Sequence, residues 1–264
     1  MPEELTFKNE AAAEYDRAFA RVSTHFIPTL LRAAHLKLGM RVLDIAAGTG
    51  LAAEAALAVV GPAGHVTAAD LSAAMVEKAR ARLGSAANVS VAVEDGLALS
   101  FSDQSFDAVV CSLGLMFFAD PLRGLVEFRR VLRRGARAAV SVNTVPERSY
   151  NTRINIAIAR HVPSLAEAAA RVFSLGDETK LKSLFEAADF RDLEMTTETH
   201  RFVLPSFDAY FRPFEQGAAS SGQAFVSLPE EVRRVVREEV RRDLGDTGGR
   251  VEVEVEYRFA SGRR

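Results

Sequence analysis

The segment from residue 41 to residue 143 alternates short apolar runs, rich in β-forming residues, with longer alanine-rich or amphipathic segments. The short runs are 41–46, 65–70, 88–93, 106–111 and 136–142, and the longer segments are 51–60, 72–83 and 121–132. Strands separated by helices indicate βαβ crossovers and therefore a parallel sheet. Residues 42–46 and 107–111 are apolar apart from Asp44 and Asp107, which is typical of strands covered on both faces.

The rest of the chain completes this architecture. Residues 176–190 predict a helix capped by Asp177, residues 191–204 predict a strand, and the alternation in 250–264 predicts a strand with one solvated face near a sheet edge. We expect an α/β fold with a doubly wound, seven-stranded, mostly parallel Rossmann-like sheet and an antiparallel last strand. The expected divisions are an N-terminal helical lid (1–40), the α/β core (41–143), a lid segment (144–175), and completion of the core (176–264) with a helical insertion at 205–247.

Composition excludes several classes of function. A formal net charge of −2 gives no reason to expect a nucleic-acid partner. The single cysteine, Cys111, excludes an intrachain disulfide and fits a reducing compartment. The polar N-terminus lacks the pattern of a secretory signal, and no apolar run approaches the roughly 20 residues that span a bilayer. We therefore expect a cytoplasmic protein that is not an integral membrane protein.

A Gly-rich turn follows the first predicted strand, between Asp44 and Gly50, and leads directly into a helix. Such a turn lets a ligand approach the backbone, and the helix N-terminus offers free N–H groups. Asp44 would repel a pyrophosphate but favours the ammonium and sulfonium groups of S-adenosylmethionine. The dinucleotide pattern G-x-G-x-x-G also fails, because Ala53 stands at its third glycine.

Two further acids follow the next strands. Asp70 lies 20 residues past Gly50, where this kind of fold places the carboxylate that accepts hydrogen bonds from ribose hydroxyls. Asp95 follows the third strand and can accept a hydrogen bond from the exocyclic amine of adenine. Any one of these acids could be a loop or cap residue. All three together with the turn predict a cofactor site at the carboxyl edge of the sheet.

The segments VLDIAAGTG, VTAADLS, VEDGLALSFSDQSFDAVVCSLGLMFFADP and EFRRVLRRGARAAVSV resemble the successive motifs of class I S-adenosylmethionine-dependent methyltransferases. The nearest branch is that of the ubiquinone/menaquinone-biosynthesis methyltransferases and their small-molecule relatives. The resemblance covers about residues 11–203 and the closing strand. It is specific for the cofactor and poorly specific for the substrate.

The resemblance implies a role for each matching position. Asp44, Ala46, Gly48 and Gly50 would shape the methionine end, with Cys111 beneath it and Tyr15 reaching its carboxylate. Asp70 and Leu71 would hold the ribose, Met75 would pack near the adenine or ribose, and Asp95, Gly96 and Leu97 would meet the adenine.

Four positions depart from the family pattern. Ala46 replaces a common glycine, which is tolerated if its φ is negative. Arg134 and Ala136 replace a proline and a glycine in the turn before the fifth strand, which leaves the conformation of that turn open. Asn143 stands where close relatives often carry an aromatic residue, so the substrate side is expected to differ.

Catalytic side chains are less clearly indicated. Cys111 could be a nucleophile, but a thiol ending a buried strand is usually a packing residue. The five histidines lack metal-ligand spacing, so no metal is expected. His25 lies on the N-terminal helical segment and could serve as a general base, although a partly exposed structural histidine is the simpler interpretation.

Aromatic residues follow the fourth strand and recur in the insertion. They are either core residues or the roof of an apolar substrate pocket. The substrate candidates, with Asn143, are Phe117, Phe118, Tyr150, Phe211 and Phe214. The arginine-rich runs near residues 129–134 and 233–242 are a helix end and a solvated helix face, respectively, rather than a nucleic-acid site.

These observations predict methyl transfer from S-adenosylmethionine, leaving S-adenosylhomocysteine, to an O, N or C nucleophile of a small, partly apolar acceptor by in-line displacement. Positioning can supply most of the acceleration, so a dedicated acid or base is not required. The protein is expected to be a monomer or homodimer. Two rival interpretations stay open, namely a nicotinamide-dependent oxidoreductase and a non-catalytic regulator of the same fold.

Overall fold

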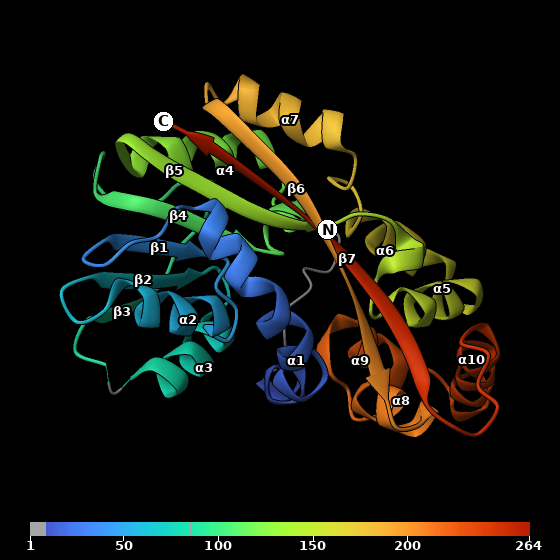
Figure 1. Ribbon diagram of the computed structural model, residues 1–264. Helices are drawn as coiled ribbons and strands as arrows, with labels where there is room; N and C mark the ends of the chain where they lie inside the picture. The colour runs from blue at the N-terminus through green and yellow to red at the C-terminus, as the bar shows by residue number, and fades with distance from the viewer. Residues whose placement is uncertain (1–8, 85) are drawn as a thin grey trace.

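A seven-stranded sheet forms the centre of the computed structural model, which describes residues 9–84 and 86–264, apart from the side chains of residues 9–19, 168, 169, 219 and 220 (Figure 1). The strands are β1 (Arg41–Ile45), β2 (His65–Asp70), β3 (Val89–Val93), β4 (Phe106–Ser112), β5 (Leu132–Asn143), β6 (Arg191–Leu204) and β7 (Val251–Arg263). Their order is β3-β2-β1-β4-β5-β7-β6. The first five pair in parallel, and β7 runs antiparallel to both β5 and β6. The predicted doubly wound sheet with an antiparallel last strand is confirmed.

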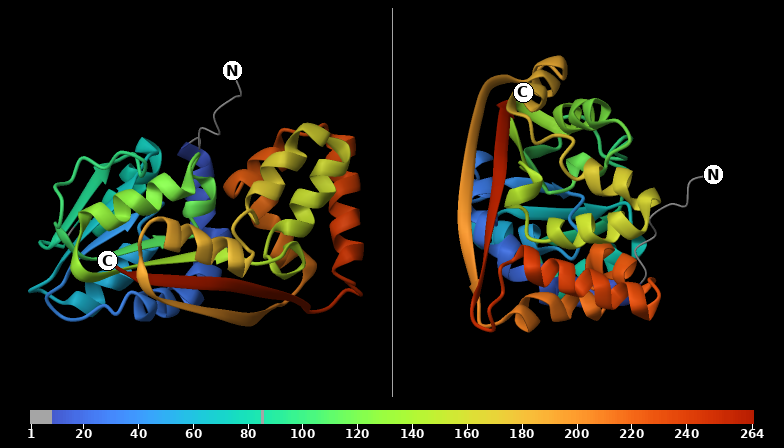
Figure 2. Two further views of the ribbon diagram at one scale, coloured as in Figure 1. Left: turned by 90° about the horizontal axis from the view of Figure 1, so that it is seen from above. Right: turned by 90° about the vertical axis from the view of Figure 1, so that its right-hand side faces the viewer.

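Helices cover both faces of this sheet. One face carries α1 (Asn9–Ala33), α2 (Leu51–Val60) and α3 (Ala73–Leu83), and the other carries α4 (Pro121–Val131) and α7 (Glu178–Ala187) (Figures 1 and 2). The predicted N-cap Asp177 is present in α7, and Ser72 and Asp120 cap α3 and α4 in the same way, since each of the three side chains accepts a backbone N–H from the first turn. Two apolar cores result, one on each face of the sheet.

The hairpin of β6 and β7 extends past the end of β5. Asn143, the last residue of β5, pairs with Tyr257, so Val251–Glu256 and their partners on β6 lie beyond the parallel strands. Helices from the two lid segments pack there and form what we call the helical cap (Figure 2). The cap consists of α5 (Thr152–His161), α6 (Ala166–Arg171), α8 (Phe207–Glu215), α9 (Ala219–Val226) and α10 (Glu230–Asp243), with short 3₁₀ turns at Pro146–Arg148 and Pro163–Leu165.

The last strand lies near the edge of the sheet, as expected, but is not the edge strand itself. β7 lies between β5 and β6, so the edge strand is β6. The polar face of β7 is solvated only in part, because Glu256 is 8% exposed and accepts hydrogen bonds from Thr199 and Arg148. The alternation correctly indicated a strand with one polar face, and ion pairs cover the part of that face around Glu256.

Two further features of the chain are settled by the structure. Residues 9–33 form one continuous helix, α1, which contains Pro28. The turn predicted before the fifth strand lies inside β5, where Gly135 has a left-handed φ of +80° although Arg134 and Ala136 replace the residues common in the family. Within the described residues, no helix is both long and apolar enough to cross a membrane.

Candidate functional site

Asp44 occupies the interior of β1, in register with Ala68 of β2 and Val110 of β4. Its side chain has no exposed surface, and no group in the described part of the chain forms a hydrogen bond with either carboxyl oxygen. Burial raises the pKa of Asp44 to about 8, the Asp70 carboxylate adds to the shift, and the nearby Ala53 amide opposes it. A buried carboxylate without a partner is costly in a folded protein. The arrangement therefore suits a cationic ligand that would pair with it.

The turn after β1 adopts left-handed backbone conformations at three positions. Gly48 has a φ of +56° and Gly50, the N-cap of α2, has a φ of +86°. A Cβ built on Gly48 would meet no atom within 4 Å, so this glycine borders open space. Ala46 has a φ of +55°, which contradicts the expectation of a negative φ at this position. The family glycine is thus replaced here by an alanine in a conformation that L-residues rarely adopt.

Asp70 ends β2 and fastens this turn. Its Oδ2 accepts a 2.8 Å hydrogen bond from the Gly48 N–H, and its Oδ1 accepts a 2.9 Å bond from the Ser72 N–H. Burial raises the pKa of Asp70, and these two backbone N–H groups oppose the shift. Each oxygen retains a further lone pair. The side chain can accept from ribose hydroxyls while it holds the turn.

Helix α3 packs directly against the same turn. A Cβ on Gly50 would lie 3.3 Å from the Ala79 Cβ and 3.1 Å from a methyl group of Leu83, so no larger residue fits without displacement. The Arg82 guanidinium donates a 2.8 Å hydrogen bond to the Thr49 carbonyl and pairs with Glu54 of α2 at 3.2 Å. Arg82 was not singled out from the sequence, because its partner is a backbone carbonyl that no sequence pattern marks.

The loop after β3 carries the predicted adenine residues. Asp95 is exposed, and its Oδ1 accepts a 2.8 Å hydrogen bond from the Leu97 N–H. Gly96 is buried, and a Cβ there would lie 2.4 Å from the Phe118 ring. The structure thus brings the ends of β1, β2 and β3 to one edge of the sheet, with Asp44, Asp70 and Asp95 on them.

Other predicted cofactor residues occupy the surroundings of this edge. Cys111 is fully buried in β4, and burial together with Asp44 raises the pKa of its thiol, so it remains a neutral packing group. Met75 is buried in the first turn of α3, whereas Leu71 is 70% exposed beside Asp70. The Tyr15 side chain lies outside the described residues. Among those described, no cluster of metal-ligating side chains could hold a metal ion.

The two phenylalanines after β4 have different environments. Phe117 is 54% exposed at the carboxyl edge of the sheet. Phe118 packs between two glycines, because a Cβ on Gly96 or on Gly124 would lie within 2.5 Å of its ring. It also meets Phe128 edge-on at 6.0 Å. The geometry accounts for Phe118 by packing and leaves Phe117 available to an acceptor.

The remaining substrate candidates are buried. Asn143 ends β5 with 8% exposure, and Tyr150 is 7% exposed. Phe211 and Phe214 have no exposed surface and pack with Phe207, Tyr210 and Phe225 in the core of the cap. The Tyr210 hydroxyl donates a 2.7 Å hydrogen bond to the Tyr150 carbonyl, which ties α8 to the segment before α5. These aromatics stabilise the cap, and their contacts do not require an acceptor.

The structure places His25 beside β6 rather than at the end of β1, and its role as a general base stays a prediction to be tested. Its Nε2 lies 3.1 Å from Glu198 Oε1, and its ring stacks on His200 with centroids 3.7 Å apart. Both partners belong to β6, which β4, β5 and β7 separate from β1. The four strand spacings from β1 to β6 add up to about 19 Å across the sheet. The helix face that carries His25 packs on the edge strand, a placement that helical periodicity alone does not reveal.

Comparison with known proteins identifies the family of the chain. Residues 42–135 match a family model described as a methyltransferase domain. The chain is 33% identical to a demethylmenaquinone methyltransferase of Clavibacter sepedonicus over 75% of this chain and 89% of that one. A crystal structure of a Bacillus halodurans protein described as a methyltransferase aligns with a TM-score of 0.57 and 20% identity over 90% of this chain and 97% of that one.

A Haemonchus contortus phosphoethanolamine N-methyltransferase in complex with S-adenosyl-L-methionine aligns with a TM-score of 0.62 and 16% identity, covering 99% of this chain and 58% of that one. The two structural alignments support the fold, and the sequence relative supports the family. The nicotinamide-dependent oxidoreductase is thereby set aside. The chain belongs to the class I S-adenosylmethionine-dependent methyltransferases, in the branch that contains the methyltransferases of menaquinone biosynthesis.

Proposed function

We propose that this protein transfers the methyl group of S-adenosylmethionine to a small, partly apolar acceptor bound at the carboxyl edge of the sheet. The observation that carries this proposal is Asp44, a buried carboxylate without a hydrogen-bond partner among the described residues, beside a turn with two left-handed glycines. A cationic cofactor meets the electrostatic requirement of Asp44. The open space beside Gly48 meets the steric requirement of a ligand that approaches the backbone.

The residues at this edge divide the recognition of the cofactor among them. Asp44, Gly48 and Gly50 would hold the methionine portion, Asp70 would accept from the ribose hydroxyls, and Asp95 would accept from the adenine amine. When bound, S-adenosylmethionine supplies an electrophilic methyl group on a positively charged sulfur. The protein's own contribution is to orient the acceptor against that methyl group and to exclude water, which supplies most of the acceleration in displacements of this kind.

An apolar acceptor is supported by what surrounds the site. Leu71, after β2, is 70% exposed and Phe117, after β4, is 54% exposed, and both follow strand ends at the cofactor edge. Large apolar side chains so exposed are favourable contact surfaces for an apolar ligand. The demethylmenaquinone methyltransferase among the relatives points the same way. We therefore propose an acceptor with an aromatic or quinone-like ring.

Two measurements test this function. Isothermal titration with S-adenosylmethionine and with NADH tests the cofactor, and binding of NADH alone would refute the proposal. A screen of phenolic, quinol and amine acceptors for release of S-adenosylhomocysteine then tests the activity. Tight cofactor binding without turnover of any acceptor would favour a non-catalytic regulator of the same fold.

A further inference from the structure

The connection between β3 and β4 crosses the sheet without a helix of its own. Residues 94–105 leave β3 at the edge of the sheet and must pass β2 and β1 to reach β4. A loop of this length without regular structure is uncommon unless it has a function. It begins with Asp95, Gly96 and Leu97, the residues assigned to the adenine. Its backbone polar groups need partners, and β2 supplies one, because the Glu94 N–H donates a 3.1 Å hydrogen bond to the Asp70 carbonyl.

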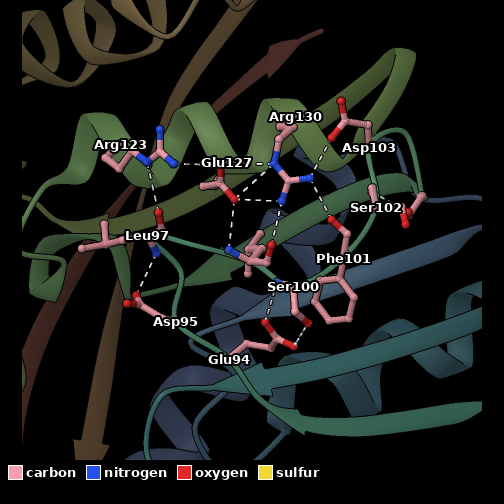
Figure 3. A network of polar contacts seen from close by, with 12 residues as sticks. Glu94, Asp95, Leu97, Ser100, Phe101, Ser102, Asp103, Arg123, Glu127 and Arg130 are labelled. Carbon is pink, nitrogen blue, oxygen red and sulfur yellow. Dashed lines mark hydrogen bonds and ion pairs between the residues drawn. The ribbon is translucent and has the colours of Figure 1, made fainter.

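Three side chains of α4 supply further partners. Arg130 donates a 2.8 Å hydrogen bond to the Leu99 carbonyl and another of 2.8 Å to the Phe101 carbonyl. Between these contacts, the Leu99 N–H donates a 3.0 Å hydrogen bond to Oε2 of Glu127. Figure 3 shows Arg123, Glu127 and Arg130 on the face of α4 that is turned toward the loop. Side chains of one helix thus hold the middle of the crossover, from Leu97 to Phe101.

The contacts of Arg123 reach the adenine residues themselves. Its Nε donates a 3.1 Å hydrogen bond to the Leu97 carbonyl, and its Nη2 lies 3.4 Å from Glu127 Oε1. The Leu97 N–H in turn donates to Asp95 Oδ1 at 2.8 Å. A continuous chain of polar contacts therefore runs from α4 through Leu97 to the Asp95 carboxylate (Figure 3).

Glu127 is the buried centre of this network. It is 4% exposed, and Arg130 Nη2 lies 2.9 Å from its Oε2. Burial favours the neutral carboxyl, but the hydrogen bonds from Arg130 and the Leu99 amide outweigh it, so the pKa of Glu127 is lowered. A buried ion pair of this kind costs desolvation free energy and is weak evidence for stability alone. What it does provide is a fixed geometry, because each charged group has several directional partners.

We propose that Arg123, Glu127 and Arg130 are positioning residues that hold Asp95–Leu97 in the geometry required to distinguish adenine from other bases. This inference rests on the proposed function, in which Asp95 accepts from the exocyclic amine of adenine. The three side chains act through the loop and need no contact with the cofactor. A purely stabilising network would affect the melting temperature and the affinity for every ligand alike, so selectivity between ligands is the property to measure.

The test compares two ligands on each folded variant. S-adenosylhomocysteine carries the adenine amine, and S-inosylhomocysteine carries a carbonyl in its place. Wild-type protein should bind the adenine form at least about tenfold more tightly, as expected for a hydrogen bond to a charged acceptor. In Arg123→Met, which removes the contact to Leu97 from a half-exposed position, the ratio should fall to about threefold or less. Arg123→Lys, which can still donate to one carbonyl, should retain most of the discrimination.

Arg129→Met is the matched control, because Arg129 lies on the same helix but bonds to Asp189 instead of the loop. It should leave the ratio unchanged. The same affinity ratio is measured for Glu127→Gln and Arg130→Met. If either of these variants fails to fold, the ratio of Arg123→Met alone tests the positioning role. If the wild-type protein prefers S-adenosylhomocysteine and Arg123→Met prefers it by the same ratio, the positioning role alone is overturned. A wild-type protein that binds both ligands equally would overturn the adenine assignment and the positioning role together.

Discussion

The carboxylate of Asp70 accepts a 2.8 Å hydrogen bond from the Gly48 N–H, so the end of β2 directly holds the turn that follows β1. The same side chain accepts from the Ser72 N–H at the start of α3. A residue assigned to the cofactor therefore also builds the site that receives the cofactor. Binding and local structure are coupled at this position, and a substitution there changes both.

Asp70→Ala should weaken the binding of S-adenosylmethionine by more than the loss of ribose hydrogen bonds, because the Gly48 turn also loses its anchor. Each buried polar group left without a hydrogen bond costs about 1–3 kcal/mol, so we expect at least a tenfold loss in affinity. Asp70→Asn should be nearly as harmful, since its amide nitrogen would oppose one of the two backbone N–H donors. Isothermal titration combined with thermal unfolding checks both effects. Unchanged affinity in both variants would place the ribose elsewhere.

A pair of glycine substitutions separates steric loss of binding from loss of folding. Gly48→Ala places a methyl group in open space and should cost about 1 kcal/mol of stability for its positive φ. That methyl group should nevertheless obstruct the cofactor. Gly50→Ala adds contacts near 3.3 Å with Ala79 and should destabilise the fold more. Titration measures the loss of cofactor affinity, and urea unfolding measures the loss of stability. We expect the ratio of affinity loss to stability loss to be larger for Gly48→Ala than for Gly50→Ala. The reverse order would mean that the cofactor does not pass Gly48.

Ala46→Gly should stabilise the protein, because glycine adopts a φ of +55° without the steric cost that alanine bears. The expected gain is about 1 kcal/mol. For a chain of this size, that corresponds to a rise in melting temperature of about 2–4 °C. Ala47→Gly is the control, since Ala47 lacks a positive φ and glycine there should destabilise. A loss of stability in Ala46→Gly would show that the Ala46 methyl contact with the Gly114 region outweighs the strain.

Local patterns were sufficient for much of this fold. The strands ending at Ile45, Asp70 and Val93 follow from apolar runs, and the caps Ser72, Asp120 and Asp177 follow from side chains that accept the first N–H groups of a helix. Because parallel strands end at one edge, the three acids at their ends could be grouped before any coordinates were known. These features depend on residues close together in the chain.

Features that depend on distant contacts were not predictable in the same way. The sign of φ at Ala46 is set by how β2 holds the turn, through the Ala47 N–H to the Ala69 carbonyl and Gly48 to Asp70. The position of His25 depends on which strand docks against α1. The role of Glu127 and Arg130 was missed because it lies in their contacts with the crossover loop, although their i, i+3 spacing on a helix was a usable signal.

His25→Gln should leave the turnover number and its pH profile unchanged, because His25 faces Glu198 and His200 rather than the cofactor edge. The pair with Glu198 is about one-third exposed on both sides, so its loss should cost less than about 1 kcal/mol of stability. A general base at the reacting atoms would instead contribute about 10²–10⁴-fold. Steady-state kinetics with an acceptor from the screen checks this. A hundredfold fall in turnover would restore His25 as the base.

Asp44 should make both stability and cofactor binding depend on pH. Its pKa is about 8 in the folded protein and 3.8 in its ordinary state, so between these values the folded protein holds a proton that the unfolded chain has lost. The contribution of Asp44 to stability is therefore present at low pH and declines as pH rises from about 4 to about 8. A cationic ligand favours the ionised carboxylate and lowers this pKa, so binding near pH 7 should release a proton and strengthen as pH approaches 8. Isothermal titration with S-adenosylmethionine in buffers of different ionisation enthalpy measures that proton. Asp44→Asn should abolish its release, and release that persists in this variant would assign the proton to another group, such as Asp70.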